Sequence, residues 1–402
     1  MSTLTTQQLD ASKVQCAICG ERHLYLPTHL EDAHGITTAE YLAQYPGSPT
    51  VSDVLLDVEK NSQPSGNRKA ATALADLRLK LKGIELDVWH NIPQDECLDM
   101  PDHYRLPKFG KLSTAVQRAV RNLAMRRHTW ISCMPGAGKD AFVHYFSAAL
   151  RRPAKCWTID PGTDLETYMY SKSLRPDGQG NTETYWELGE LYLALTEGYL
   201  CPQTGKRYPY IILLSDFDRA SKTQAEKLRL ILDSIKGRVM TPDGKAYPIV
   251  EGTVVVATAN SQGGGDTTGR CISARPVDSS LMNRFKRKVL FHLMEWKDEK
   301  EIVRSKFPLM LEKCPKSLDI IGDVTKSMRK AIENEDMHCE FSHRDVCNWA
   351  EAAEDRLNLQ PELGTSKLMS ESAFEWIDGL PDEETRIEAK RIVDHSVNDD
   401  LL

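Results

Sequence analysis

A run of small residues, a lysine and a carboxylate is the clearest chemical signature of this chain. Residues 133–140 read Cys-Met-Pro-Gly-Ala-Gly-Lys-Asp. Glycines such as Gly136 and Gly138 let successive backbone N–H groups converge on a phosphate at a helix N-terminus, while Lys139 reaches the outer phosphates. The residue after the lysine usually offers a hydroxyl to Mg²⁺, but here it is Asp140. The segment predicts a phosphate-binding loop with an altered metal ligand.

The elements around this segment must form a strand, a loop and a helix for the chemistry to work. Residues 129–132, Thr-Trp-Ile-Ser, read as a short strand, and residues 141–150 read as an amphipathic helix. Pro135, Ala137 and Ala141 complete the residues expected to line the bound phosphates. A glycine turn before an ordinary helix is the alternative reading.

A second strand is expected to carry acids to the same place. The most apolar short run, residues 210–214, is followed by Ser215 and Asp216. A buried parallel strand would deliver both side chains at its carboxyl end. In phosphate-loop ATPases that strand usually ends in Asp-Glu, where the first carboxylate assists Mg²⁺ and the second polarises the attacking water. Here Ser215 takes the first position and Asp216 the second.

Asp140 and Ser215 together suggest a reciprocal exchange of metal ligands. A carboxylate stands where a hydroxyl is usual at Asp140, and a hydroxyl stands where a carboxylate is usual at Ser215. We hypothesise that the two residues face the same Mg²⁺ with their donors swapped. The alternative is a site that binds nucleotide and hydrolyses it poorly, because Asp140 repels phosphates unless Mg²⁺ sits between them.

A third strand ends in an amide. Residues 253–259 are a buried β-branched run, and Asn260 follows directly. We expect Asn260 to orient the attacking water beside the terminal phosphate. A simple strand-end cap is the alternative, because asparagine is common at such positions.

These strands and several later stretches resemble the AAA+ superfamily, and specifically its MoxR branch, which includes the ATPase subunit of cobaltochelatase. The similar stretches follow in the same order and spacing over roughly residues 105–355: 257–260, 265–269, 281–285 and 342–350. The resemblance implies an α/β fold, with a phosphate-loop core on a parallel sheet and a helical lid. It implies ATP and Mg²⁺ as cofactors.

The resemblance also implies a role for each matching residue. Lys139 would contact the phosphates, Asp216 would lie near the water, and Asn260 would be the first sensor. Arg284 would be an arginine finger given to a neighbouring subunit, where its fork neutralises charge on the transferring phosphoryl group. Arg344 would be the second sensor, from the lid. A shared finger predicts a homo-oligomeric ring, expected to be a hexamer, and the usual partner in this branch is a protein with a von Willebrand factor A domain.

Two turn signals predict hairpins inserted in the core. Residues 175–178, Arg-Pro-Asp-Gly, and residues 242–244, Pro-Asp-Gly, are each flanked by β-prone runs. In MoxR-like proteins such insertions crown one face of the ring and touch the substrate. A surface loop is the alternative for each hairpin taken singly, but the occurrence of both in the expected places favours the insertions.

A separate group of side chains near the N-terminus has the spacing of a metal site. Cys16 and Cys19 are followed by His29 and His34. Two thiolates and two imidazoles suffice for a closed tetrahedral Zn²⁺ site, and a closed site is structural rather than catalytic. The spacing and residues 35–41 resemble the Ros/MucR type of bacterial zinc finger. Chance pairs of Cys and His are the alternative.

Relatives of that finger bind DNA, but this one is poor in basic residues. The first forty residues contain two basic residues, Lys13 and Arg22. They contain five carboxylates, namely Asp10, Glu21, Glu31, Asp32 and Glu40. Because phosphate neutralisation supplies most non-specific DNA affinity, a protein-docking or purely structural module is favoured. Nucleic acid stays an open but unfavoured partner.

The amino-acid composition is typical of a large intracellular protein. The 402 residues exceed one domain, and 41% apolar residues are enough for sizeable cores. A net charge of −7 argues weakly against a general nucleic-acid binder. The eight cysteines outside the finger are scattered, as is typical of reduced thiols, and the polar N-terminus has no apolar signal region. With no stretch as long as a membrane span, we expect a soluble, cytoplasmic protein.

Composition also divides the chain into five expected parts. They are a zinc-finger module at 1–50, a linker and helical connector at 51–107, an ATPase core at 108–294, a helical lid at 295–358 and an acidic tail at 359–402. The tail should be mostly solvated, and its amphipathic parts at 374–377 and 387–393 either dock on the lid or fray.

The expected function is that of a ring ATPase that couples Mg-ATP binding and hydrolysis to remodelling of a protein partner. One alternative is a weakly hydrolysing nucleotide-binding scaffold that recruits a target through its zinc finger. Another is a DNA-associated AAA+ motor.

Overall fold

The computed structural model describes residues 13–23, 26–50, 86–160, 162, 165–176, 181–233, 237–265 and 274–399. The chain divides into two compact units, residues 1–69 and 70–402. Three expected features lie wholly or partly outside the described residues: the connector at 51–85, the hairpin tip at 177–180 and the stretch at 266–269.

The first unit is a small module built from two short strands and two helices. Strand β1 (Val14–Gln15) pairs antiparallel with β2 (Arg22–His23), and helices α2 (Leu26–His34) and α3 (Thr38–Gln44) follow. A capping box between Thr37 and Glu40 starts α3. Its buried apolar side chains are only Cys16, Leu26, Leu30 and Tyr41 among the described residues. A hydrophobic core this small usually needs additional stabilisation, for example from a bound metal ion.

The second unit contains a five-stranded parallel sheet in the order β13-β3-β12-β9-β4. The strands are β3 (Thr129–Ser132), β4 (Ala154–Thr158), β9 (Ile211–Ser215), β12 (Val254–Ala259) and β13 (Arg287–Leu290). Strands β3, β9 and β12 are buried throughout, as the apolar runs predict. The sheet and the helices around it confirm the expected α/β phosphate-loop core, with all carboxyl ends meeting at one edge.

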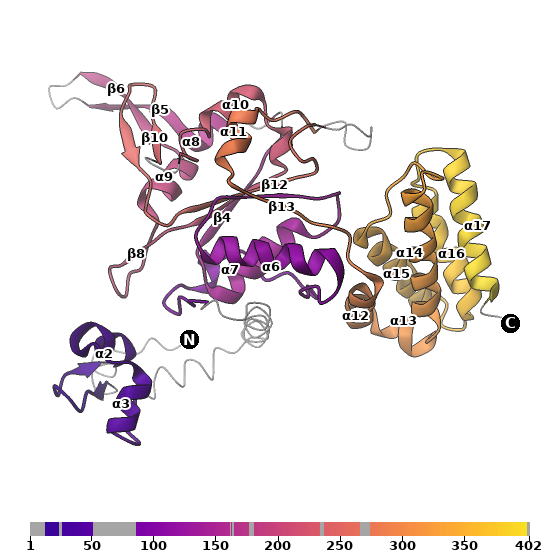
Figure 1. Cartoon of the computed structure of the whole chain (residues 1–402), viewed down its shortest axis with the longest axis horizontal. Helices are drawn as coiled ribbons and strands as arrows, with labels where there is room; N and C mark the ends of the chain where they lie inside the picture. The colour runs from indigo at the N-terminus through magenta and orange to yellow at the C-terminus, as the bar shows by residue number, and fades with distance from the viewer. Residues whose placement is uncertain are drawn as a thin grey trace. The chain divides into compact units, whose positions relative to one another are not determined.

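Helices cover both faces of this sheet (Figure 1). Helices α6 (Gly110–Ala124) and α7 (Lys139–Leu150) cover one face, where Ile131 and Leu213 join their core. The other face, with Trp130, carries α8 (Leu165–Met169), α9 (Glu190–Glu197), α10 (Lys222–Lys227) and α11 (Ser279–Arg284). The alternation of strand side chains between two cores follows from the two-residue period of a strand.

Both predicted hairpins are present. Strand β5 (Tyr170–Pro176) pairs with β6 (Thr182–Leu188), and β10 (Arg238–Met240) pairs with β11 (Ala246–Pro248). A third, unpredicted hairpin joins β7 (Tyr199–Leu200) to β8 (Arg207–Tyr208). Single-turn 3₁₀ helices η1 (Gln94–Glu96) and η2 (Phe217–Arg219) complete the core.

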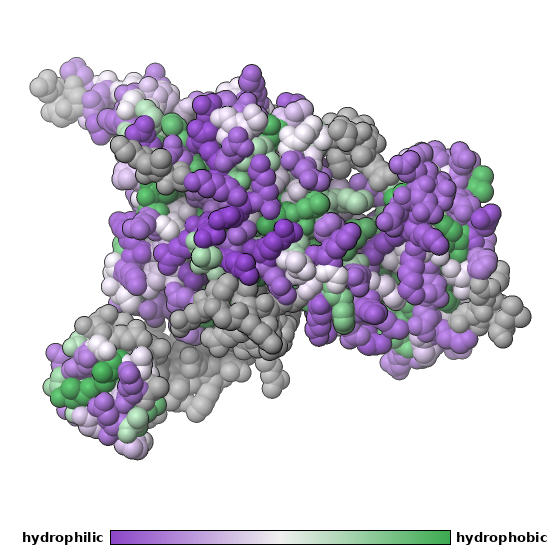
Figure 2. Space-filling view, in the orientation of Figure 1, coloured by the Kyte–Doolittle hydropathy of each residue, from purple (hydrophilic) through white to green (hydrophobic). Residues whose placement is uncertain are grey.

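Six helices form the lid: α12 (Trp296–Lys306), α13 (Pro308–Lys313), α14 (Ser317–Glu333), α15 (His343–Leu359), α16 (Thr365–Ile377) and α17 (Glu383–Asp399). The last two lie in the expected tail, which is less solvated than expected. Its amphipathic parts dock on the lid, one of the two expected outcomes, because Leu368, Met369 and Val393 are buried in one core with Trp349 of α15. The acids of this region lie on the outer faces of amphipathic helices, and Figure 2 shows a mainly hydrophilic surface over them. The lid therefore extends through residue 399.

None of the helices in the described ranges combines the length and the apolar character that crossing a bilayer requires.

Candidate nucleotide and metal sites

The phosphate loop follows β3 and leads directly into α7. Gly136 and Gly138 have φ angles of 76° and 78°, a left-handed conformation that favours glycine. Cys133, which stands where the strict motif has its first glycine, is buried and donates its backbone N–H to Ala259 of β12. Burial raises the pKa of its thiol to about 12, so this cysteine is a neutral packing group.

Three of the predicted residues meet over this loop. Nζ of Lys139 donates to Oδ1 of Asn260 at 2.7 Å and lies 3.9 Å from Oδ1 of Asp216. Nδ2 of Asn260 donates to the same Asp216 oxygen at 3.1 Å. The phosphate-binding cation, the amide and the acid thus form one triangle at the carboxyl edge of the sheet, where a phosphate and its attacking water would be handled together.

Asp216 and Asp218 determine the backbone conformation next to these three side chains. Asp216 has a φ angle of 52°, a strained conformation for a residue with a side chain. Oδ2 of Asp218 accepts the backbone N–H groups of Asn260 and Ser261 at 3.0 and 2.8 Å. Burial raises the pKa of Asp218. Asp218 therefore holds the turn that presents Asn260.

Asp140 has a partner that the sequence did not suggest. Oγ1 of Thr258, a fully buried residue of β12, donates to Oδ1 of Asp140 at 2.5 Å. Ser215, the residue expected to complement Asp140, is buried at the end of β9. The carboxylate and hydroxyl oxygens gathered here are of the kind that Mg²⁺ prefers, so the donor chemistry fits this ion.

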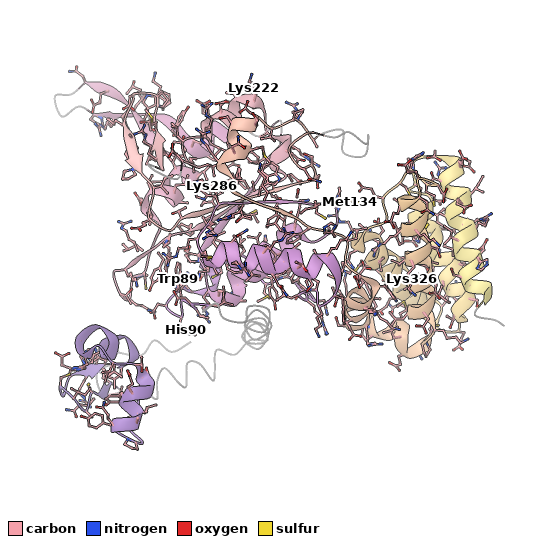
Figure 3. The ribbon with its side chains drawn as sticks, viewed as in Figure 1. Trp89, His90, Met134, Lys222, Lys286 and Lys326 are labelled. Atoms are coloured by element: carbon pink, nitrogen blue, oxygen red, sulfur yellow. The ribbon has the colours of Figure 1, made fainter. Side chains whose placement is uncertain are left out.

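The lid rests on the phosphate loop. A β-carbon added to Gly136 would stand 2.9 Å from Cβ of Ser342 and 3.3 Å from Cβ of Arg344. Ser342 caps the N-terminus of α15 and forms a capping box with Asp345. The positive end of the helix and the exposed Arg344 are thereby brought beside the loop that would hold phosphates. Met134 of this loop is labelled in Figure 3.

A buried ionic cluster fixes the start of α15. Glu299 of α12 is fully buried and accepts two hydrogen bonds from Arg329 of α14 and one from Nδ1 of His343. Burial opposes the charge of His343, but its hydrogen bonds with Cys347 and Glu299 outweigh this effect and raise its pKa to about 9. His343 is therefore a cation at neutral pH, balanced by Glu299.

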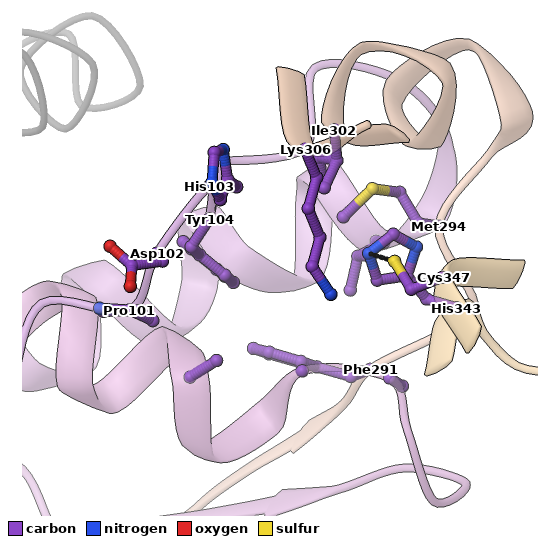
Figure 4. Close-up of a pocket in the computed structure, with 14 residues that line it drawn as sticks. Pro101, Asp102, His103, Tyr104, Phe291, Met294, Ile302, Lys306, His343 and Cys347 are labelled. Atoms are coloured by element: carbon purple, nitrogen blue, oxygen red, sulfur yellow. Dashed lines mark hydrogen bonds between the residues drawn. The ribbon is translucent and has the colours of Figure 1, made fainter. Parts of the chain in front are cut away.

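A cavity of about 250 Å³ lies between the core and the lid (Figure 4). Tyr104, Phe291, Met294 and Ile302 contribute to a mostly apolar lining that includes Gly138 of the phosphate loop. The volume is several times that of a water molecule, about 30 Å³. An apolar pocket that opens beside a phosphate loop suits the base of a nucleotide.

Arg284 is not part of this cluster within its own chain. Its guanidinium is half-buried at the end of α11 and donates to the carbonyl and the hydroxyl of Ser280, both at 2.9 Å. The structure thus brings Lys139, Asp216, Asn260 and the lid residue Arg344 to one edge, and places Arg284 on a separate helix.

The four predicted zinc ligands also come together. The ligand atoms of Cys16, Cys19, His29 and His34 all lie within 4.8 Å of one another. Sγ of Cys16 is 3.6 Å from Nε2 of His34, and Sγ of Cys19 is 3.1 Å from Nε2 of His29. These spacings suit a Zn²⁺ tetrahedron, whose S···N edges are about 3.5 Å for ordinary bond lengths. Burial and the neighbouring His23 lower the pKa of His29, which favours the neutral imidazole a metal requires.

The opposite nitrogen of His29 faces a carboxylate. Nδ1 of His29 lies 3.6 Å from Oε2 of Glu21, which also contacts Nε2 of His23 at 3.3 Å. The rings of His23 and His29 stack with their centres 4.1 Å apart. Such a carboxylate orients a metal-binding imidazole and fixes the nitrogen that carries its proton.

Four residues of these sites were not predicted from the sequence: Thr258, Asp218, Ser342 and Glu21. Thr258 alternates with Val254 and Val256, which face the core under α6 and α7, so strand alternation places it on the side of the phosphate-loop helix, and that signal is readable. Ser342 begins a readable capping box. No local pattern marked the contact of Ser342 with Gly136 or of Glu21 with His29, because both depend on how separate elements pack.

The chain has distant structural neighbours among known proteins but no sequence match. No protein-family profile and no curated protein sequence matches this chain. Among solved structures, a mutant of RuvB from Thermotoga maritima is 12% identical and matches 68% of this chain and 71% of its own, with a TM-score of 0.42. NtrX from Brucella abortus in complex with ADP is 13% identical and matches 74% of this chain and 64% of its own, with a TM-score of 0.43.

Proposed function

We propose that this chain is an AAA+ ATPase of the MoxR branch, similar to the ATPase subunit of cobaltochelatase. It assembles into a ring, expected to be hexameric, and couples Mg-ATP binding and hydrolysis to remodelling of a protein partner. The observation that supports this most directly is the triangle of Lys139, Asp216 and Asn260 at the phosphate loop. By resemblance, the partner carries a von Willebrand factor A domain.

Each residue has a stated task in this proposal. The loop N–H groups and Lys139 bind the phosphates, and Asp140 with the nearby oxygen side chains would hold Mg²⁺, which would neutralise phosphate charge. Asp216 and Asn260 position the attacking water, and Asp216 polarises it. Arg344 senses the terminal phosphate from the lid, and Arg284 acts on the nucleotide of a neighbouring subunit.

The direct test is Mg²⁺-dependent phosphate release by the purified chain at concentrations that allow ring formation. Lys139→Ala should abolish turnover, whereas Lys326→Ala should not. Lys326 lies on the lid, and its exposed ion pair with Asp323 contributes little. A wild type that binds no nucleotide under any condition would refute the proposal.

A second candidate, a scaffold ring that binds ATP but hydrolyses little, is favoured by Asp140 in the place of a hydroxyl. Restoring the usual residue types at positions 140 and 215 would distinguish the scaffold from the hydrolysing ATPase. If the exchange works, Asp140→Thr and Ser215→Asp each abolish turnover and the double change restores it. Turnover that appears only in the double variant identifies a scaffold. Partner-stimulated turnover is expected for a remodeller alone, and DNA binding with a steep salt dependence would instead support a DNA motor.

A further inference from the structure

The hydroxyl that complements Asp140 comes from an unexpected strand. Strand alternation places both Ser215 of β9 and Thr258 of β12 on the face covered by α7, and the register sets the preceding pair, Leu214 and Ala257, opposite each other. Both hydroxyls therefore approach the start of α7, where Asp140 lies. The hydrogen bond of 2.5 Å is made by Thr258.

This contact is short and shielded from solvent. Thr258 is fully buried, and Asp140 is half-buried in the first turn of α7. A hydroxyl that donates to a carboxylate typically lies 2.5–2.7 Å away and forms one of the stronger hydrogen bonds. Because threonine has few χ1 rotamers, the buried strand holds the donor in one place. One carboxylate oxygen, Oδ1, is thereby fixed, and for Oδ2 the described part of the chain gives no hydrogen bond.

We propose that Thr258 is a positioning residue for the magnesium-binding carboxylate of this site. Its hydroxyl fixes Oδ1 of Asp140 so that the carboxylate approaches Mg²⁺ in one orientation. A hydroxyl of β12 thereby holds the loop carboxylate, and Asn260 follows directly after the same strand. This inference rests on the proposed nucleotide function and names a further residue of the same site.

The experiment measures how nucleotide binding depends on Mg²⁺. Binding of a fluorescent ATP analogue is titrated with Mg²⁺ for the wild type, Thr258→Val and Thr258→Ser. Valine keeps the branched shape without the hydroxyl, and serine keeps the hydroxyl. Loss of an outer-sphere hydrogen bond typically weakens metal binding about 10- to 100-fold. We expect the half-saturating Mg²⁺ concentration to rise about tenfold in Thr258→Val and to stay within about twofold of wild type in Thr258→Ser.

The same substitution made in a chain that already carries Asp140→Ala separates an effect through Asp140 from a general packing effect. If Thr258 acts through Asp140, Thr258→Val should cause no further change in a chain that already carries Asp140→Ala. An equal shift in both backgrounds, or an unchanged Mg²⁺ dependence in Thr258→Val, would overturn the proposal. Thr258→Ala serves if the valine variant does not fold, and thermal unfolding checks each protein.

The controls keep this inference apart from the proposed function. Asp140→Ala should bind nucleotide in the presence of a chelator, because it lacks the carboxylate that repels phosphates. Failure of the wild type and of Asp140→Ala to bind nucleotide would refute the proposed function and this inference together. Nucleotide binding by the wild type that is indifferent to Mg²⁺ would leave the nucleotide site standing and refute the role of Thr258.

Discussion

Ser342, at the N-terminus of the lid helix α15, lies so close to Gly136 of the phosphate loop that a β-carbon on the glycine would stand 2.9 Å from Cβ of the serine. The lid can therefore lie against the phosphate loop only because residue 136 has no side chain. A change in the phosphates at this loop would act directly on the N-terminus of α15. This is a physical route from the state of the nucleotide to the position of the lid.

Replacement of Gly136 should separate the lid from the loop. Gly136→Ala adds a β-carbon in a left-handed conformation and against Ser342, so we expect at least a tenfold loss of nucleotide affinity or turnover, since a misplacement of about 1 Å can cost about 100-fold. The control is Gly364→Ala, at a position with no atom within 4 Å of the added carbon and no positive φ. Calorimetric nucleotide binding and phosphate release would measure both variants, and equal behaviour would contradict the contact.

The ionic cluster of Glu299 and His343 predicts a pH-dependent lid. The pKa of His343 is raised from 6.5 to about 9, so its stabilising contribution is complete below pH 6.5 and is lost as the pH rises through about 9. The pKa of Glu299 is lowered from 4.5, because its hydrogen bonds with His343 and Arg329 outweigh the opposing effect of burial. Its contribution is complete above pH 4.5 and is lost as the pH falls.

Thermal unfolding at pH 6.5 and pH 9.5 would test this dependence. The free energy of unfolding of the wild type should fall between these values by on the order of 2 kcal/mol from this cluster. His343→Gln should lack most of that fall, while His90→Gln, at an exposed position outside the lid, should retain it. An unchanged pH profile in His343→Gln would show that the histidine is not charged in the folded lid.

Glu21 should strengthen zinc binding without touching the metal. Glu21→Gln removes the carboxylate that faces Nδ1 of His29, and we expect zinc affinity to fall about tenfold, measured by competition with a chromogenic chelator. Glu40→Gln is the matched control, because it makes the same charge change while glutamine preserves the capping box of α3. Cys16→Ser should lose the metal, about one per chain in the wild type. Equal affinities for the two glutamine variants would contradict the role of Glu21.

Mixing two inactive variants would test the shared arginine. If the proposed roles hold, Lys139→Ala loses phosphate binding and Arg284→Ala leaves its neighbour's site incomplete, so each alone should be inactive. A random equal mixture should recover about a quarter of wild-type turnover, because about one interface in four joins an intact Lys139 to an intact Arg284 of the next subunit. Mixtures no more active than either variant would show that Arg284 does not act between subunits, and phosphate release measures the outcome.

Local sequence patterns predicted those parts of the site that are formed by residues adjacent in the sequence. The glycines and lysine between β3 and α7 are readable because a strand, a tight turn and a helix each depend on a few consecutive residues. The zinc group is readable for a similar reason, since Cys16 and Cys19 share one turn, and His29 and His34 share one helix. For the tail, composition favoured solvation, yet the buried stripe of α16 and α17 shows that a few apolar positions decide where a helix packs.

The sequence by itself determined the three strands that carry polar residues at their carboxyl ends, the glycine-rich loop between β3 and α7, and the four Cys and His residues of the N-terminal cluster. Only the tertiary structure decided that Asp140 meets Thr258, 118 residues later, rather than being paired with Ser215. It also decided that α15 lies on Gly136 and that Glu299, Arg329 and His343 form one cluster. Hydrogen bonds within a turn or helix depend on adjacent residues, whereas these contacts depend on the packing of separate elements, which no single stretch of sequence specifies.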